Sequence, residues 1–257
     1  MFLKSNNLPF ITKESSKCML GILSKNICDK DDVVSWTVRG KNHVVIIDDN
    51  VSSNTISRLK DVKKANLHYL SDNSVNELSK FFKVKIQRGI SVIIDVDCLD
   101  FSGKKNKQFR NYLNKYSNFE VVNHLKKPTD LKIMIKDWSD NMGEKYFRNM
   151  SGKNVYFFNN NYHLQCENVF VYDDDMLVAF GVTSPVRNGA NSYVIGKALS
   201  HKYPGMAEFV DMKMYKYLFN KYGPFSINLG QGSGGLLKYK MKFPGARQQI
   251  HYHGSFE

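Results

Sequence analysis

A glycine-rich segment near the end of the printed sequence restricts the folds that this chain can adopt. The segment "INLGQGSGGLLKYKMKF" covers residues 227–243 and contains a G-x-G-x-x-G pattern at Gly230, Gly232 and Gly235. A dinucleotide-binding fold requires an acidic residue about 20 positions after such a loop, and further βα units beyond it. Only 22 residues follow Gly235, and their sole acid is Glu257. We therefore expect neither a Rossmann-type cofactor site nor a kinase glycine loop here.

The order of predicted elements indicates an α+β fold. Short β-branched runs and apolar residues at helical spacing predict strands at 43–48 and 91–97, and helices at 71–82 and 103–119. The same signals predict helices at 129–138 and 205–223, a hairpin at 169–182, and strands at 192–196, 225–230 and 247–253. The segment "HLKKPTD" (124–130) interrupts the pattern, so we place a domain boundary there, with one unit at 1–123 and a second at 124–257.

The lysine-rich end of the glycine segment fits two secondary structures. As a strand, "LKYKMKF" would place Lys238, Lys240 and Lys242 on one face; as a helix, it would place Lys238 and Lys242 together at i and i+4. In both cases a cationic cluster, extended by Arg247, lies beside the glycines. Successive backbone N–H groups at such a turn can receive an anion or a developing oxyanion, although a simple tight turn explains the glycines equally well.

The charge and the cysteines limit the partners and the compartment. Lys and Arg total 37 against 24 acids, which gives a net charge of +13 and favours nucleic acid, phosphates or an anionic membrane face. Four cysteines lie far apart without a C-x-x-C pair, which suits a reducing compartment. Because no secretory signal or apolar run of membrane-spanning length is visible, we expect a cytoplasmic protein, for which peripheral membrane contact remains open.

Two stretches together resemble a known family. The first is "FSGKKNKQFRNYLNKYSNF" (101–119), and the second is the glycine segment; "FVYDDDMLVAFG" and "PGMAEFVDMKMYKYLFNKYG" lie between them. This order of motifs resembles the C-terminal catalytic domain of lysylphosphatidylglycerol synthases. That domain is related to the Fem-type peptidoglycan aminoacyltransferases, and the resemblance covers roughly residues 90–252. It implies two tandem GNAT-like acyltransferase units with mixed β-sheets. It also implies aminoacyl-tRNA as co-substrate, no further cofactor, and a small-molecule, peptide or lipid-headgroup acceptor.

The resemblance also assigns site residues. By match, it assigns Lys104, Lys105, Arg110 and Asn111 from the basic helix, and Asn228, Gly230, Gly235, Lys240 and Lys242 from the glycine segment. Two departures concern the residues that help hold the donor. Leu237 stands where the family often has a basic residue, and "YVIGKALSHKYPG" (193–205) lacks the Arg of the family's Asp-x-Met-Arg pattern. The donor amino acid is therefore left open.

An aminoacyl ester is already activated, so its transfer requires alignment, an oxyanion donor and removal of a proton from the acceptor. The candidate bases are Glu208, Asp211 and the 173–175 run, and we favour Glu208, with Asn228 and Lys240 as the other catalytic residues. We predict that the tRNA end faces Lys104 to Lys115 together with Lys238, Lys242 and Arg247. No metal site is predicted, because the pair His251 and His253 lacks a third ligand at a suitable spacing.

Two other functions remain as alternatives. An acyl-CoA-dependent N-acyltransferase would need a pyrophosphate-binding loop before a central helix, whereas the nearest match, at 231–236, follows a late strand. A non-catalytic RNA-binding module would keep the basic helix without turnover.

Overall fold

The computed structural model of the protein describes residues 25–30, 33–38, 40–46, 51–62, 64–97, 101–141, 154–155, 157–186 and 189–256. Its strands are β1 (Lys25–Lys30), β2 (Val33–Val38), β3 (Lys41–Ile46), β4 (Ala65–Leu70), β5 (Val84–Val96), β6 (Glu120–Val122), β7 (Glu167–Asp173), β8 (Met176–Thr183), β9 (Ala190–Ala198), β10 (Phe225–Gln231) and β11 (Ala246–Phe256). Its helices are α2 (Ser53–Lys60), α3 (Asp72–Ser79), η2 (Lys104–Asn106), α4 (Lys107–Lys115), α5 (Pro128–Asp140), η3 (Tyr162–Gln165), α7 (Met206–Tyr222) and α8 (Gly234–Lys240).

The strands of the described residues form one mixed sheet of eleven strands, in the order β1-β2-β3-β4-β11-β5-β10-β9-β8-β7-β6. The pairs β3–β4 and β9–β10 are parallel and the other neighbours are antiparallel. The predicted α+β fold with a mixed sheet is therefore confirmed.

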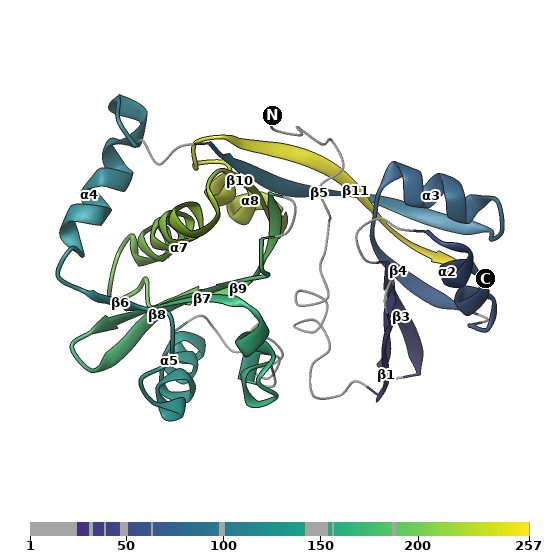
Figure 1. Ribbon diagram of the computed structural model, residues 1–257, viewed down its shortest axis with the longest axis horizontal. Helices are drawn as coiled ribbons and strands as arrows, with labels where there is room; N and C mark the ends of the chain where they lie inside the picture. Colours follow the sequence, from purple (N-terminus) through teal and green to yellow (C-terminus); the bar gives the residue numbers. More distant parts are fainter. Residues whose placement is uncertain are drawn as a thin grey trace.

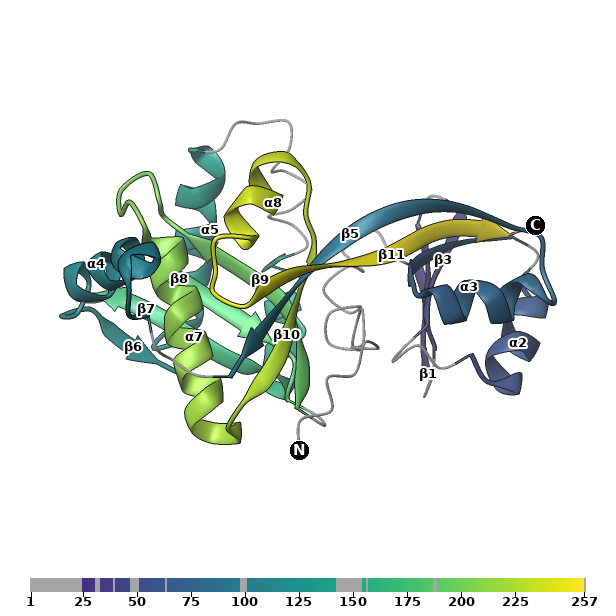
Figure 2. The same ribbon diagram turned by 90° about the horizontal axis from the view of Figure 1, so that it is seen from above.

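Two long strands connect the two ends of the molecule (Figures 1 and 2). β11 pairs with β5 along its whole length, from Ala246 opposite Ile94 to Phe256 opposite Val84, and its last residues also pair with β4. The final strand of the described chain thus lies between strands from the first half. The boundary that we placed between residues 123 and 124 stays a prediction; in the structure β6 lies before it and pairs with β7 after it.

Helices cover both faces of the sheet formed by β6 to β10. Figure 1 shows α7 over one face and α5 over the other. Phe209, Met214 and Leu218 of α7 are fully buried in one core with Ile227 of β10. A second core on the opposite face contains Met134 of α5, among other apolar side chains. At the other end of the molecule, α2 and α3 bury Leu59 and Leu78 against the strands β3, β4 and β11. Burial of this apolar surface is the main force that holds each layer in place.

The second half follows the sequence prediction closely. The hairpin forms β7 and β8, with Asp174 at a φ of 52° in the turn, and the predicted 205–223 helix forms α7, which ends at Gly223. The first half departs from it, because β1, β2, β4 and α2 lacked a clear sequence signal and β5 begins seven residues earlier than the predicted start at Ser91. The additional residues, 84–90, are largely exposed, so no buried apolar run marks them.

Candidate active site at the glycine turn

The glycine segment is a turn that leads from β10 into the short helix α8. Asn228 is buried, and its Oδ1 accepts a hydrogen bond of 2.7 Å from the backbone N–H of Gly230, which has a φ of +72°. The N–H of Gly232 donates to the carbonyl of Ile90 at 3.1 Å. A Cβ on Gly232 would lie 3.1 Å from Cα of Leu237, so α8 approaches the turn closely. Two of the N–H groups that we expected to receive an anion are thus bonded within the protein.

The helical alternative for the lysine segment is correct, and it directs Lys240 inward. Only 9% of Lys240 is exposed, and its Nζ donates to the carbonyls of Leu229, Gly230 and Gln231 at 2.6, 3.2 and 2.8 Å. An ammonium group has three hydrogens, so these three acceptors match it fully. Burial lowers the pKa of Lys240 from 10.5 to about 8, and the nearby Asp211 charge acts in the opposite direction. Lys240 therefore holds the end of β10 and can lose its proton near neutral pH.

Asp211 lies one helical turn into α7 and is also buried. Its Oδ1 accepts from the hydroxyl of Tyr193 at 2.6 Å, and its Oδ2 accepts from the hydroxyl of Tyr239 at 2.7 Å. Burial raises the pKa of Asp211 to about 6; the two tyrosine hydrogen bonds act against this shift, Glu208 adds to it, and Lys240 opposes it. Near pH 7 the lysine and the carboxylate are both charged, yet each is within about one pH unit of losing its charge.

Two glycines provide the space for Tyr193. Gly181 of β8 and Gly196 of β9 are directly opposite each other in the sheet. A Cβ on Gly181 would lie 3.0 Å from the Tyr193 hydroxyl oxygen, and one on Gly196 would lie 2.2 Å from it. Only side-chain-free residues permit this approach, so the glycine pair allows the phenol to reach Asp211.

Glu208, the favoured base, lies in the first turn of α7. Its carboxylate forms an ion pair of 3.5 Å with Nζ of Lys242, and its side chain is 12% exposed. It also lies close enough to Asp211 to raise the pKa of that carboxyl. The structure therefore brings Glu208, Asp211, Lys240 and Lys242 together around the junction of α7 and α8.

The basic helix and the lysine segment meet in the structure. Phe109 of α4 lies 5.1 Å from Phe243, measured between ring centroids, and Phe243 also contacts Tyr215 of α7 and Tyr239 of α8. The side chains of Lys104, Lys105, Asn111, Lys238 and Lys242 are exposed. Two segments far apart in the sequence thus present their cations from elements that pack together.

Two of the predicted phosphate-binding residues, Arg110 and Arg247, make contacts within the protein. Nη1 of Arg110 donates to the carbonyls of Phe101 and Gly103 and so stabilises the turn before η2. Arg247 forms an ion pair of 2.8 Å with Asp95, a residue that also accepts a hydrogen bond from Ser226. β5 brings Asp95 to this arginine of β11 from 152 positions away in the sequence.

The tyrosine contacts of Asp211 were not predicted from the sequence. Tyr193, Tyr215 and Tyr239 occur in apolar patterns where an aromatic ring is the expected core residue. Tyr193 and Tyr239, the two that donate to Asp211, lie 18 and 28 positions away from it in the sequence. The glycines at 181 and 196 were the available signal, because glycine in a strand interior often marks a close approach.

Four histidines lie together where β3, β4 and β11 join, apart from the site above. Nε2 of His251 is 3.0 Å from Nε2 of His253, Nδ1 of His43 is 3.0 Å from Nε2 of His68, and the rings of His68 and His253 are in edge contact. We call these four residues the histidine cluster. No group of three or more His, Cys, Asp or Glu side chains in the described residues is arranged to hold a metal ion.

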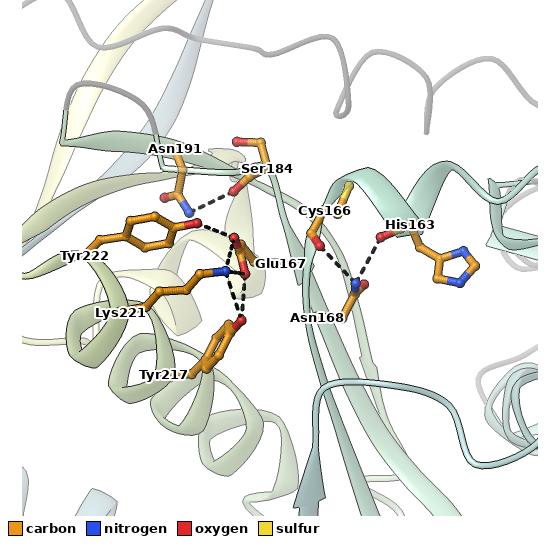
Figure 3. A network of polar contacts seen from close by, with 9 residues as sticks. All are labelled: His163, Cys166, Glu167, Asn168, Ser184, Asn191, Tyr217, Lys221 and Tyr222. Atoms are coloured by element: carbon orange, nitrogen blue, oxygen red, sulfur yellow. Dashed lines mark hydrogen bonds and ion pairs between the residues drawn. The ribbon is translucent and has the colours of Figure 1, made fainter.

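A polar network anchors the C-terminal end of α7 to the start of β7 (Figure 3). Glu167 is buried and accepts hydrogen bonds from Tyr217, Lys221 and Tyr222. These contacts outweigh the effect of burial and hold the pKa of Glu167 below its usual value. The network fixes the far end of the helix that carries Glu208 and Asp211. Among the described residues, no helix is long and apolar enough to cross a membrane.

Comparison with solved structures shows the same fold in proteins of low sequence identity. A conserved protein of unknown function from Bacteroides thetaiotaomicron VPI-5482 superimposes with a TM-score of 0.71 at 15% identity, covering 99% of this chain and 93% of the other. The structure of L-PGS from Bacillus licheniformis gives a TM-score of 0.69 at 14% identity, covering 94% and 85%. FemX gives 0.58 at 10% identity, covering 93% and 89%.

A sequence search among curated proteins gives no significant match. Residues 63–249, however, match the profile of the family described as "Phosphatidylglycerol lysyltransferase, C-terminal". The match spans most of the chain and includes both motifs that carried the resemblance, and the FemX likeness agrees with the predicted relation of the fold to Fem-type enzymes. The predicted enzyme class, an acyltransferase of the aminoacyl-tRNA-dependent kind, is confirmed at the level of the family. The chain belongs to the family of phosphatidylglycerol lysyltransferase C-terminal domains.

Proposed function

We propose that the protein transfers an amino acid from aminoacyl-tRNA to an amine or hydroxyl acceptor. The observation that carries this proposal is the buried pair of Lys240 and Asp211 at the glycine turn, where α7 and α8 meet. The pKa of Lys240 is about 8 and that of Asp211 about 6, so both groups change protonation near neutral pH. Buried ionisable groups with perturbed pKa values are typical of functional sites, where they can also hold the reacting groups in position.

In the proposed reaction, a nitrogen or oxygen of the acceptor attacks the carbonyl carbon of the aminoacyl ester. The new C–N or C–O bond forms, the bond between the carbonyl carbon and the ribose oxygen breaks, and the base that takes the acceptor's proton passes it to the departing ribose oxygen. Glu208, which is partly exposed, is placed to receive the acceptor's proton, and Lys242 beside it provides positive charge for the oxyanion. Lys240 holds the turn that borders this site.

The donor's acceptor stem would lie along the exposed cations of η2, α4 and α8. Lys104 and Lys105 lie on η2, Lys238 lies on α8, and Lys242 lies two residues after the end of α8. Phosphate contacts from lysine supply most of the sequence-independent affinity for RNA and make it depend on salt. Arg110 stabilises this surface through its contacts with the 101–103 turn.

The first experiment uses total tRNA charged with mixed labelled amino acids, hydroxylamine or a diamine as acceptor, and acetyl-CoA in a parallel reaction. Faster deacylation of one aminoacyl-tRNA would support the proposal and name the donor amino acid. Thiol release from acetyl-CoA without an effect on tRNA would contradict it and favour an acyl-CoA enzyme. Binding of tRNA without turnover would favour the RNA-binding module.

A matched pair of variants tests the tRNA surface. Lys105→Glu reverses a charge on the surface of η2, whereas Lys132→Glu reverses an exposed charge on α5, which covers the opposite face of the sheet. We expect Lys105→Glu to weaken tRNA binding about 5- to 10-fold at low salt and Lys132→Glu to change it by less than about 2-fold. Equal effects of the two variants would contradict the assignment of this surface.

A further inference from the structure

Asp211 is buried and is contacted from three elements of the fold. Tyr193 reaches it from β9, Tyr239 reaches it from α8, and Glu208 and Tyr215 lie near it on α7 itself. Both carboxylate oxygens already accept a tyrosine hydroxyl, and only 7% of the residue is exposed. A substrate would have to displace a tyrosine to reach it. The geometry therefore disfavours the role of proton acceptor that the sequence left open for Asp211.

The helix α8 depends on such contacts for its position. It has seven residues, begins with two glycines, and its N-cap Ser233 makes no side-chain capping hydrogen bond. An isolated helix of this length and composition is unstable in water, since about 12 residues or more are needed even for good helix formers. Its place in the fold is therefore set by the side chains that it inserts into the protein.

Two neighbouring residues of α8 are anchored in different directions. Tyr239 donates to Asp211 on α7, while Lys240 donates to the carbonyls at the end of β10. Successive residues of a helix point about 100° apart, so two such anchors fix both the position and the rotation of α8. Removal of the Asp211 contact would free the helix to rotate about the Lys240 contacts.

We propose that Asp211 is a positioning residue, which holds α8 through Tyr239, is itself held by Tyr193, and so places Lys240 and Lys242 at the glycine turn. The part of this inference that concerns catalysis rests on the proposed function; the part that concerns the helix does not.

The strength of the Asp211 contacts also depends on pH. Protonation turns a carboxylate that accepts two hydrogen bonds from tyrosine hydroxyls into a neutral group that is a weaker acceptor. The contacts that hold α8 therefore weaken as the pH falls through about 6, the pKa of Asp211.

The titratable groups that face Asp211 come from each element packed against it: Tyr193 from β9, Glu208 and Tyr215 from α7, and Tyr239 and Lys240 from α8. Burial raises the pKa values of all three tyrosines, so they stay protonated and remain donors across the pH range of an assay. Lys240, with a pKa of about 8, takes up its proton as the pH falls through 8, and Asp211, with a pKa of about 6, does so at lower pH.

The test compares Asp211→Asn, Tyr239→Phe and Tyr193→Phe with the control Tyr112→Phe, which removes an exposed hydroxyl of α4 bonded to Gln108. The first measurement is amide hydrogen exchange in the full chain, followed in peptides that cover α8 and α5. We expect exchange in 234–243 to become about 10-fold faster or more in Asp211→Asn and Tyr239→Phe, with 128–140 unchanged and the control like the parent protein. Tyr193→Phe keeps the carboxylate and should give a smaller increase.

The second measurement is the pH profile of aminoacyl transfer. In the parent protein we expect activity to fall below about pH 6, and in Asp211→Asn we expect kcat to fall about 10-fold or more without this acidic limb, while KM for tRNA changes less than about 2-fold. Unchanged exchange in both Asp211→Asn and Tyr239→Phe would overturn the proposal. If the parent protein transfers no amino acid, the proposed function fails, and the exchange experiment still decides whether Asp211 holds α8.

Discussion

The histidine cluster predicts that the protein loses stability as the pH falls from about 7.5 to 5, before most carboxylates titrate. Burial and the neighbouring histidines lower the pKa of both His68 and His251 from 6.5 to about 4. An unfolded chain therefore binds more protons than the folded chain between these values. The stability that the neutral rings contribute is fully present above pH 6.5 and is lost as the pH falls toward 4.

The magnitude follows from linkage. For one group with a pKa of 6.5 unfolded and about 4 folded, the free energy of unfolding falls by about 2 kcal/mol between pH 7.5 and pH 5, so His68 and His251 together account for about 4 kcal/mol. Asp211 acts in the opposite direction, because its pKa is raised from 3.8 to about 6. Over the same interval its protonation increases the free energy of unfolding by about 1.4 kcal/mol. The expected net loss is about 2 to 3 kcal/mol, a large part of the stability of a typical domain.

The assay is urea unfolding, followed by circular dichroism at several values between about pH 5 and 7.5. His251→Asn removes one titrating ring, which is fully buried and lies 3.0 Å from Ser91, and should reduce the loss of stability over this interval by about 2 kcal/mol. Its stability at pH 7.5 can differ from that of the parent protein, so the comparison uses the change with pH. The control His124→Asn alters an exposed histidine outside the cluster and should keep the parent slope.

A parent protein whose stability is flat between these pH values would refute the reasoning. The same holds if His251→Asn and His124→Asn show identical slopes, because the effect would then come from groups outside the cluster.

Three further substitutions test the packing that supports the site. Gly196→Ala places a Cβ 2.2 Å from the Tyr193 hydroxyl oxygen and should destabilise the protein by about 1 to 3 kcal/mol in thermal unfolding. Glu167→Gln removes the charge that three side chains share at the end of α7 and should cost about 1 to 3 kcal/mol in urea unfolding. Phe243→Ala removes the ring that joins α4, α7 and α8, and should cost about 3 to 5 kcal/mol by either method.

Each of these three substitutions has a matched control variant of the same protein. Gly235→Ala adds a Cβ that meets nothing within 4 Å, Glu120→Gln breaks an exposed ion pair with Lys126, and Leu236→Ala truncates a side chain that is 53% exposed. Surface changes of this kind usually alter stability by less than about 0.5 to 1 kcal/mol. A control as damaging as its partner would show that the cited contacts do not carry the stability assigned to them.

The local elements of the second half and the motifs that carry the family resemblance can be recognised from the amino-acid sequence alone. The hairpin of β7 and β8 and the helix α7 follow from turn residues, period-two alternation and an amphipathic face, which are properties of neighbouring residues. The family resemblance indicated Lys240 as a site residue, and the position of Glu208 early in the predicted helix indicated it as a candidate base. The sequence does not decide between strand and helix for 237–243, because these seven residues fit both periods.

The contacts of the site residues, by contrast, depend on how the elements pack in three dimensions. Lys240 became a buried anchor of the β10 carbonyls, Arg247 became the partner of Asp95, and Asp211 became the point where Tyr193 and Tyr239 meet. These contacts join residues that are 11, 152, 18 and 28 positions apart. A sequence pattern indicates the period of a single helix or strand. Burial, pKa shifts and hydrogen-bond partners depend instead on which elements pack together in the fold. In this protein, β5 and β11 bring distant parts of the chain into one sheet.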